Sequence, residues 1–147
     1  MGFEGSGLAE AMQRLRTLEA NADKILQKAL IEGAMMIQGT AKLLCPVDTG
    51  QLRNSIVVAP LPRGAVIGTN LEYAAHVEYG TGPAGATAGG QKTYKSKGWR
   101  FKDHVTGKWV HSNGQAPQPF LYPAVVMSEE RVKKHIASKI SEALKGR

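Results

Sequence analysis

The chain has 147 residues, of which 42% are hydrophobic and 21% charged, a balance typical of one globular domain rather than a disordered segment. Its single cysteine, Cys45, excludes an internal disulfide framework and a cysteine-based zinc site. The formal net charge of +7 favours acidic partners such as nucleic acid, anionic lipid or an acidic protein face, and a solvated basic surface accounts for it equally well. The amino end lacks the pattern of a secretory signal, and no apolar run approaches the roughly 20 residues of a membrane span, so we expect a soluble, cytosolic protein.

Apolar residues keep helical spacing throughout positions 8–44, and no proline interrupts them. Asn21 and Asp23 are residue types that cap helices, so we expect two helices, at about 8–20 and 22–44.

The second of these helices is rich in small residues. Gly33 and Gly39 each cost about 1 kcal/mol relative to alanine in a helix interior, so we expect a strand or a neighbouring subunit to pack closely there. Pro46 is expected to end the helix, because the residue before a proline is disfavoured in the α conformation.

A β-hairpin is predicted next. β-branched and apolar runs at 55–59 and 65–69 flank a turn at 60–64 that contains two prolines and a glycine. Before it, the sequence at 48–50 is typical of a tight turn that leads into a strand opened by Leu52. After it, residues 70–80 are expected to form a short helix or an irregular turn.

The segment 82–117 differs in composition from the rest of the chain. It opens with a glycine-rich tract at 82–90 that predicts a flexible loop, and then becomes basic and aromatic. Aromatic residues on both sides of a glycine-bearing turn predict a second hairpin. The candidate contacts with a partner or with DNA are Lys92, Lys95, Lys97, Trp99, Arg100, Lys102, Lys108 and Trp109. Cations mixed with aromatic rings suit non-specific nucleic-acid binding, and the alternative is that the rings pack on the core or on a neighbouring subunit.

A carboxyl-terminal helix is predicted with Ser128 as its N-cap, because apolar residues follow at four-residue steps. We therefore predict an α+β fold in which a long N-terminal helical segment and a C-terminal helix pack on a small antiparallel sheet, with a long extended basic loop or hairpin. We expect one domain over residues 1–147, with a flexible insertion at about 82–117.

The sequence predicts no catalytic, cofactor or metal site. Cys45 lies at a helix end without a motif around it and is interpreted as a packing residue. The four histidines lack metal-binding spacing, and the glycines at 80–82 lack the lysine and hydroxyl residue of a phosphate-binding loop. We therefore expect a protein that is not an enzyme.

Three short blocks resemble, in order and spacing, the family named after gp10 of phage HK97. They are Pro46–Ile56 (PVDTGQLRNSI), Tyr73–Gly82 (YAAHVEYGTG) and Gln118–Ala124 (QPFLYPA). The residues that carry the resemblance are Pro46, Asp48, Thr49, Gly50, Leu52, Tyr73, Tyr79, Gly80, Phe120 and Pro123.

The resemblance implies a structural subunit of a siphophage neck or tail end, acting as a tail-completion, tail-terminator or neck-ring protein. It implies a ring, with sixfold order because siphophage tail tubes are hexameric, and DNA passing through it. The implied partners are the tail tube protein and the head-completion or connector proteins, and the implied location is the virion after assembly in the host cytoplasm. The alternative is a basic nucleic-acid-binding regulator that acts through residues 92–109.

Overall fold

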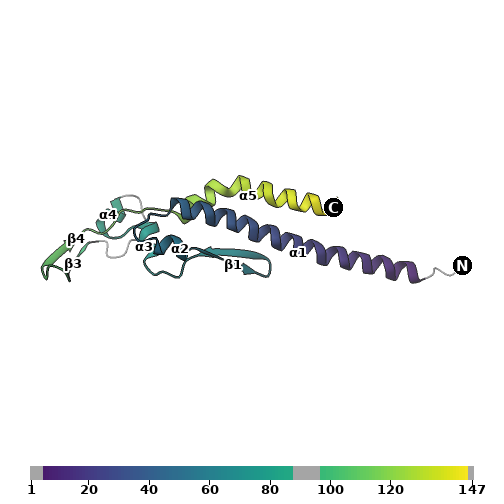
Figure 1. Ribbon diagram of the computed structural model, residues 1–147, viewed down its shortest axis with the longest axis horizontal. Helices are drawn as coiled ribbons and strands as arrows, with labels where there is room; N and C mark the ends of the chain where they lie inside the picture. The colour runs from purple at the N-terminus through teal and green to yellow at the C-terminus, as the bar shows by residue number, and fades with distance from the viewer. Residues whose placement is uncertain (1–4, 88–96, 146–147) are drawn as a thin grey trace.

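The computed structural model describes residues 5–87 and 97–145 and shows an elongated molecule organised along one long helix (Figure 1). The elements are, in order, α1 (Gly5–Leu44), α2 (Gln51–Ser55), β1 (Val57–Leu61), β2 (Gly64–Gly68), α3 (Ala74–Tyr79), α4 (Gly82–Thr87), β3 (Trp99–Lys102), β4 (Trp109–Ser112) and α5 (Leu121–Leu144). The described strands form two separate antiparallel pairs, β1–β2 and β3–β4. The predicted α+β class, with a long N-terminal helix and a C-terminal helix, is confirmed.

α1 is one continuous helix of 40 residues, about 60 Å long at 1.5 Å per residue. The prediction of two helices with a break near Asn21 and Asp23 is wrong. Positions 8–32 contain neither proline nor glycine, and an asparagine or aspartate in an exposed helix costs only about 0.7 kcal/mol. That cost is too small to interrupt a helix in this place. The helix ends at Leu44, just before Pro46, as predicted.

The carboxyl-terminal half of α1 lies between α5 on one side and the β1–β2 hairpin on the other (Figure 1). A Cβ atom built on Gly33 would lie 2.8 Å from Cγ1 of Val132, so the glycine permits α5 to approach α1 closely. The close packing expected at Gly33 is therefore confirmed, with α5 as the neighbour. At Gly39 a Cβ would meet nothing within 4 Å.

Two glutamines of α1 attach the hairpin to the helix. The side-chain amide of Gln38 donates to the carbonyl oxygen of Ile56 at 2.7 Å. The amide of Gln27 donates to the carbonyl oxygen of Leu61 and, at 3.3 Å, to that of Gly64 at the turn. Both ends of β1 are thus held against α1, which matters because an isolated two-stranded hairpin is only marginally stable in water.

The predicted hairpin is confirmed, but its turn is shorter than expected. Its strands meet across Pro62 and Arg63 rather than across five residues. The expected strand opened by Leu52 is wrong, because residues 51–55 form α2 instead. That segment contains no β-branched residue before Ile56, and Gly50 adopts φ 81°, which turns the chain directly into the helix.

α5 begins at Leu121, so the prediction of Ser128 as its N-cap is wrong. Ser128 lies inside the helix, fully buried, and its hydroxyl donates to Oγ1 of Thr40 at 3.0 Å. Nearby, Nε2 of His135 and a carboxylate oxygen of Glu32 lie 2.7 Å apart. These two polar contacts join α5 to α1.

The structure describes part of the segment 82–117. Gly82–Thr87 forms the short helix α4 where a flexible loop was expected, and the second hairpin is confirmed as β3–β4. The remainder of the glycine-rich tract and the start of the basic run, with Lys92 and Lys95, lie outside the described residues. The expectation of one domain with a flexible insertion stays a prediction.

Candidate assembly surfaces

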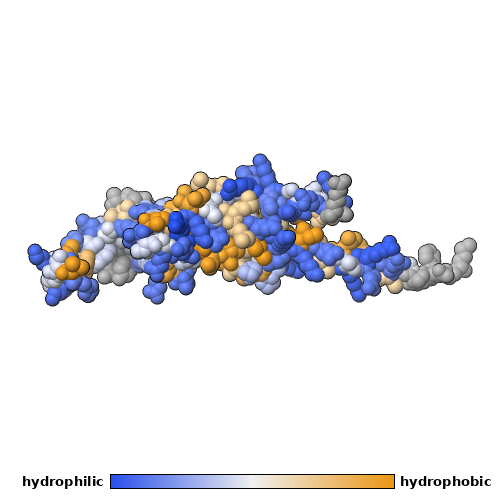
Figure 2. Space-filling model, in the orientation of Figure 1, coloured by the Kyte–Doolittle hydropathy of each residue, from blue (hydrophilic) through white to orange (hydrophobic). Residues whose placement is uncertain are grey.

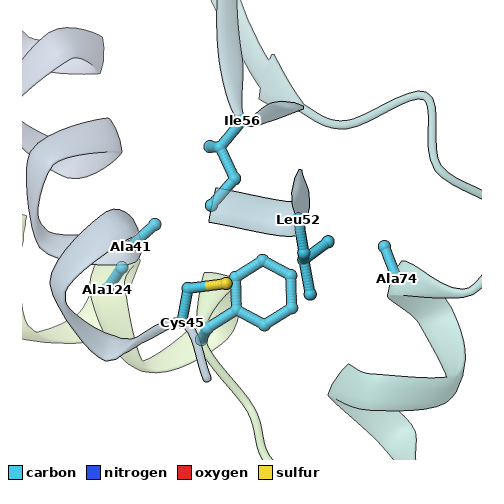
Figure 3. Packing of buried hydrophobic residues seen from close by; sticks show 7 residues of the cluster. Ala41, Cys45, Leu52, Ile56, Ala74 and Ala124 are labelled. Carbon is cyan, nitrogen blue, oxygen red and sulfur yellow. The ribbon is translucent and has the colours of Figure 1, made fainter. Parts of the chain in front are cut away.

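The first and third motif blocks meet in a small core. Cys45, Leu52 and Ile56 point toward one another from the end of α1 and from α2 (Figure 3), and Phe120 joins the same cluster. Burial raises the pKa of the Cys45 thiol, which suits the packing role predicted for it. The block that starts at Pro46 therefore builds the core beneath the start of α5.

Glu78 connects the second block to the third. Its side chain is buried, at 7% exposure, and its two carboxylate oxygens accept three backbone N–H groups. The donors are Phe120 at 2.8 Å, Leu121 at 3.0 Å and Tyr122 at 2.9 Å. The first N–H groups of a helix have no partner within the helix, and a negative charge there also interacts favourably with the helix dipole. Glu78 thus caps α5 from 42 residues away in sequence.

The backbones of these two blocks are also paired. Thr81 and Gln115 exchange two backbone hydrogen bonds, at 2.8 and 3.0 Å, and the N–H of Gln118 donates to the carbonyl oxygen of Val77 at 2.8 Å. The three blocks, which are separated in sequence, are therefore held together where α1, α3 and α5 meet, a region we call the joint.

The predicted motif residues divide into buried and exposed groups. Leu52, Gly50, Gly80 and Phe120 are buried, and Pro46 and Pro123 are half-buried. Asp48, Thr49, Tyr73 and Tyr79 are exposed. Asp48, Thr49 and Tyr73 line one groove of about 560 Å³ on the outside of the joint, together with Gln115 and Gln118. In this groove three of the four exposed motif residues are accessible to a partner, and Tyr79 lies outside it.

The β3–β4 hairpin carries the described members of the basic segment and lies at the end of the molecule opposite the amino terminus (Figure 1). Its register pairs Arg100 with His111 and Lys102 with Trp109. Because cross-strand partners share a face and alternate residues point to opposite faces, these four residues share one face. That face combines cations with an aromatic ring, and Trp109 is 65% exposed.

The other face of this hairpin is apolar. The register places Trp99, Phe101 and Val110 there. Lys97 precedes the hairpin and Lys108 lies at its turn, both exposed. The acid at the turn, Asp103, accepts hydrogen bonds from the Thr106 hydroxyl at 2.6 Å and the Val105 N–H at 3.0 Å, and these bonds lower the pKa of its carboxyl. The ion pairs found among the described residues lie in α1 and α5.

The molecule exposes far more surface than a compact monomer. Its accessible surface is 11086 Å² for a mass of 15.8 kDa. A compact monomer of this mass exposes about 7300 Å². Large apolar side chains are exposed along the body, including the start of α5 and the tip of the β3–β4 hairpin (Figure 2). Among the described residues, the large side chains that are fully buried are few: Phe120 and Ile56, with Leu52 nearly so. The chain is therefore more extended than a compact monomer of its mass, and it leaves large apolar side chains exposed.

Comparison with known families gives a match over the N-terminal part of the chain. The model of the family described as "Bacteriophage HK97-gp10, putative tail-component" matches residues 9–80, close to half of the chain. Over these residues the chain is similar to the HK97-gp10-like family. The match covers most of α1, the elements from α2 to α3, the first motif block and the second block as far as Gly80. The core and Glu78 join the third block to this part of the chain. No curated protein and no solved structure matches the chain.

The sequence analysis missed Glu78, the residue that couples the HK97-gp10-like segment to α5. The sequence did contain a signal for this role, because Glu78 lies between the apolar Val77 and the aromatic Tyr79. An acid that is buried with such neighbours almost always has a hydrogen-bonding or charged partner. Within the described ranges, no group of His, Cys, Asp and Glu is placed to hold a metal ion. None of the helices in the described part combines the length and the apolar run that crossing a membrane requires.

Proposed function

We propose that the chain is a non-catalytic structural subunit of the siphophage head–tail junction. In this role, copies form a ring that caps the end of the tail tube and joins it to the capsid connector, and DNA passes through the ring. One observation carries the proposal: a chain with a tail-component family segment exposes about half as much surface again as a compact monomer. Such a surface suits a subunit that contacts copies of itself and other rings in the virion.

The proposed contacts use different parts of the body. The β1–β2 hairpin has two strands, so its edges are free to pair with a neighbouring subunit. The groove at the joint and the apolar face of the β3–β4 hairpin are available to the tail tube protein or to the head-completion and connector proteins. Sixfold symmetry is proposed because siphophage tail tubes are hexameric.

The test is a comparison of phage particles made with and without this chain. Electron microscopy of the particles lacking it should show filled heads and separate tails, and supplying the chain in trans should restore joined virions. Normal, joined particles in its absence would refute the proposal.

The cationic face of the β3–β4 hairpin favours a second candidate, a nucleic-acid-binding regulator. Arg100 and Lys102 share that face with Trp109, so phosphate contacts and base stacking are available together. The double reversal R100E/K102E should weaken binding to non-specific duplex and reduce the slope of log K against log salt by about two. The matched control K24E/K28E makes the same charge change on exposed positions of α1 and should leave binding intact.

Duplex binding alone does not separate the two candidates, because DNA also passes through the proposed ring, so the particle experiment decides between them. A regulator would bind duplex when free in solution and would leave head–tail joining unaffected when removed. A ring subunit would show the joining defect, whether or not the hairpin contacts the DNA that passes through.

A further inference from the structure

The first half of α1 extends beyond the end of α5 (Figure 1), and every described residue from 7 to 24 is exposed. We call this part the overhang. Its apolar side chains form a stripe, with Leu8 at 69%, Leu15 at 65% and Leu18 at 65% exposure. An isolated helix of this length is marginal in water, and helices gain most of their stability from packing an apolar face. The overhang therefore requires a covering partner.

The stripe continues the face of α1 that α5 already covers. Leu8, Leu15, Ala22 and Ala29 follow at seven-residue steps and so lie on one side of the helix. Ala29 is fully buried, and Gly33, one turn later, packs on Val132 of α5. The same face is thus covered by a helix in the second half of α1 and bare in the first half, which indicates that a helix is also the occupant of the overhang.

A second bare surface lies at the start of α5. From residue 120 to 127 the only polar side-chain group is the hydroxyl of Tyr122, which is 73% exposed. Val125, Val126 and Met127 are also exposed, and Figure 2 shows apolar surface in this place. A helix that is apolar all round is normally buried. The next turns, from Ser128 onward, carry charged residues on their outer side in the ordinary way.

These two surfaces cannot meet within one chain. The start of α5 lies over the carboxyl end of α1, where Ala124 and Ala41 share the core, and the overhang begins where α5 finishes. They can meet between copies, in a head-to-tail contact. The surface in excess of a compact monomer, about 3800 Å², lies within the 2000–5000 Å² typical of obligate subunit interfaces.

The polar side of the overhang argues against other occupants. Residues 7–24 contain three acidic and three basic side chains, Glu10, Arg14, Arg16, Glu19, Asp23 and Lys24. A helix that binds anionic membranes or nucleic acid is expected to be rich in Lys and Arg instead. A balanced polar side suits a protein surface of mixed charge such as that of α5.

We propose that the overhang of one copy packs its apolar stripe on the first two turns of α5 of the next copy. Because the two patches differ, the contact is heterologous and generates a closed ring or a filament. The inference rests on the proposed ring, for which it supplies the subunit interface. It assigns the overhang a partner of stated chemistry, a second copy of this chain.

Engineered disulfides test this contact, since the natural Cys45 is buried and leaves introduced cysteines as the exposed thiols. After mild oxidation, a mixture of the L15C and V126C variants should give a cross-linked dimer, while each variant alone should not. The doubly substituted chain L15C/V126C should give a ladder of oligomers. The control Q13C lies on the opposite side of the overhang from Leu15 and should not cross-link to V126C.

Other results of the cross-linking and microscopy experiments would contradict either the proposed contact or the proposed function. Cross-linking of L15C to itself would overturn the proposal in favour of paired overhangs. Rings in the microscope without any cross-link between L15C and V126C would overturn the proposed contact and leave the ring intact. The expected ladder, together with normal head–tail joining in particles lacking the chain, would support the contact and refute the proposed function.

A substitution that adds charge to the stripe provides a second readout. Leu15 is exposed in the protomer, so L15E should retain the helix content of the wild-type chain. Burying the added carboxylate at the interface should raise the concentration needed for assembly about tenfold or more. Q13E adds the same charge on the other side of the helix and should assemble as wild type. Equal assembly of the two variants would contradict the proposal.

Discussion

The substitution Glu78→Gln removes the charge that caps α5 and keeps the shape of the side chain. One carboxylate oxygen accepts the N–H groups of Phe120 and Leu121, and the other accepts that of Tyr122. The amide of glutamine has one acceptor oxygen, so an NH₂ group would face at least one of these donors. A hydrogen bond to a charged group contributes about 1.5–3 kcal/mol, and the interaction with the helix dipole about 0.3–1 kcal/mol more. The expected loss in the free energy of unfolding is about 2–4 kcal/mol.

Urea unfolding followed by circular dichroism measures this loss at a fixed protein concentration, because self-association also contributes to the apparent stability. Amide hydrogen exchange locates it: the N–H groups of Phe120, Leu121 and Tyr122 should exchange much faster in the variant. Glu72→Gln, at an exposed acid just before α3, is the matched control and should change stability by less than about 0.5 kcal/mol. Equal stability of the Glu78 and Glu72 variants, with unchanged exchange at the start of α5, would refute the capping role.

The other substitutions examine the contact between α1 and α5. Gly33→Ala should destabilise the protein by about 1–3 kcal/mol, because its Cβ would lie 2.8 Å from Cγ1 of Val132, whereas Gly39→Ala should stabilise it by up to about 1 kcal/mol; urea unfolding measures both. The hydrogen bond with His135 holds the pKa of Glu32 below its usual value, so its contribution to stability is present above the unfolded pKa and is lost as the pH falls through the lower folded pKa. Glu32→Gln should therefore lower the melting temperature near neutral pH and have no effect at a pH below both pKa values; a constant difference at all pH values would contradict this.

The parts of the fold that local signals specify were predictable from the sequence. The β1–β2 hairpin follows from β-branched runs around Pro62 and Arg63, and the end of α1 follows from Pro46. The continuity of α1 was not predicted, because capping residue types also occur inside helices when they are exposed, as Asn21 and Asp23 are. Local propensity cannot separate these two cases.

Interactions between residues that are far apart in the sequence were harder to predict. Ser128 has the sequence context of an N-cap, yet the carboxylate of Glu78 caps the helix at Phe120, two turns earlier. No local pattern links residues 42 positions apart. The division of the basic hairpin into a cationic and an apolar face likewise required the strand register, which places Lys102 opposite Trp109. The candidate contact residues were found by composition, and their grouping came from the structure.

The central claim is that this chain is built to assemble with copies of itself. Native mass spectrometry of the purified full-length chain tests it most directly, at concentrations that span the micromolar range. A closed oligomer of one stoichiometry, lost in L15E and retained in Q13E, is the predicted result. A chain that stays monomeric and fully folded across the whole range would contradict the account.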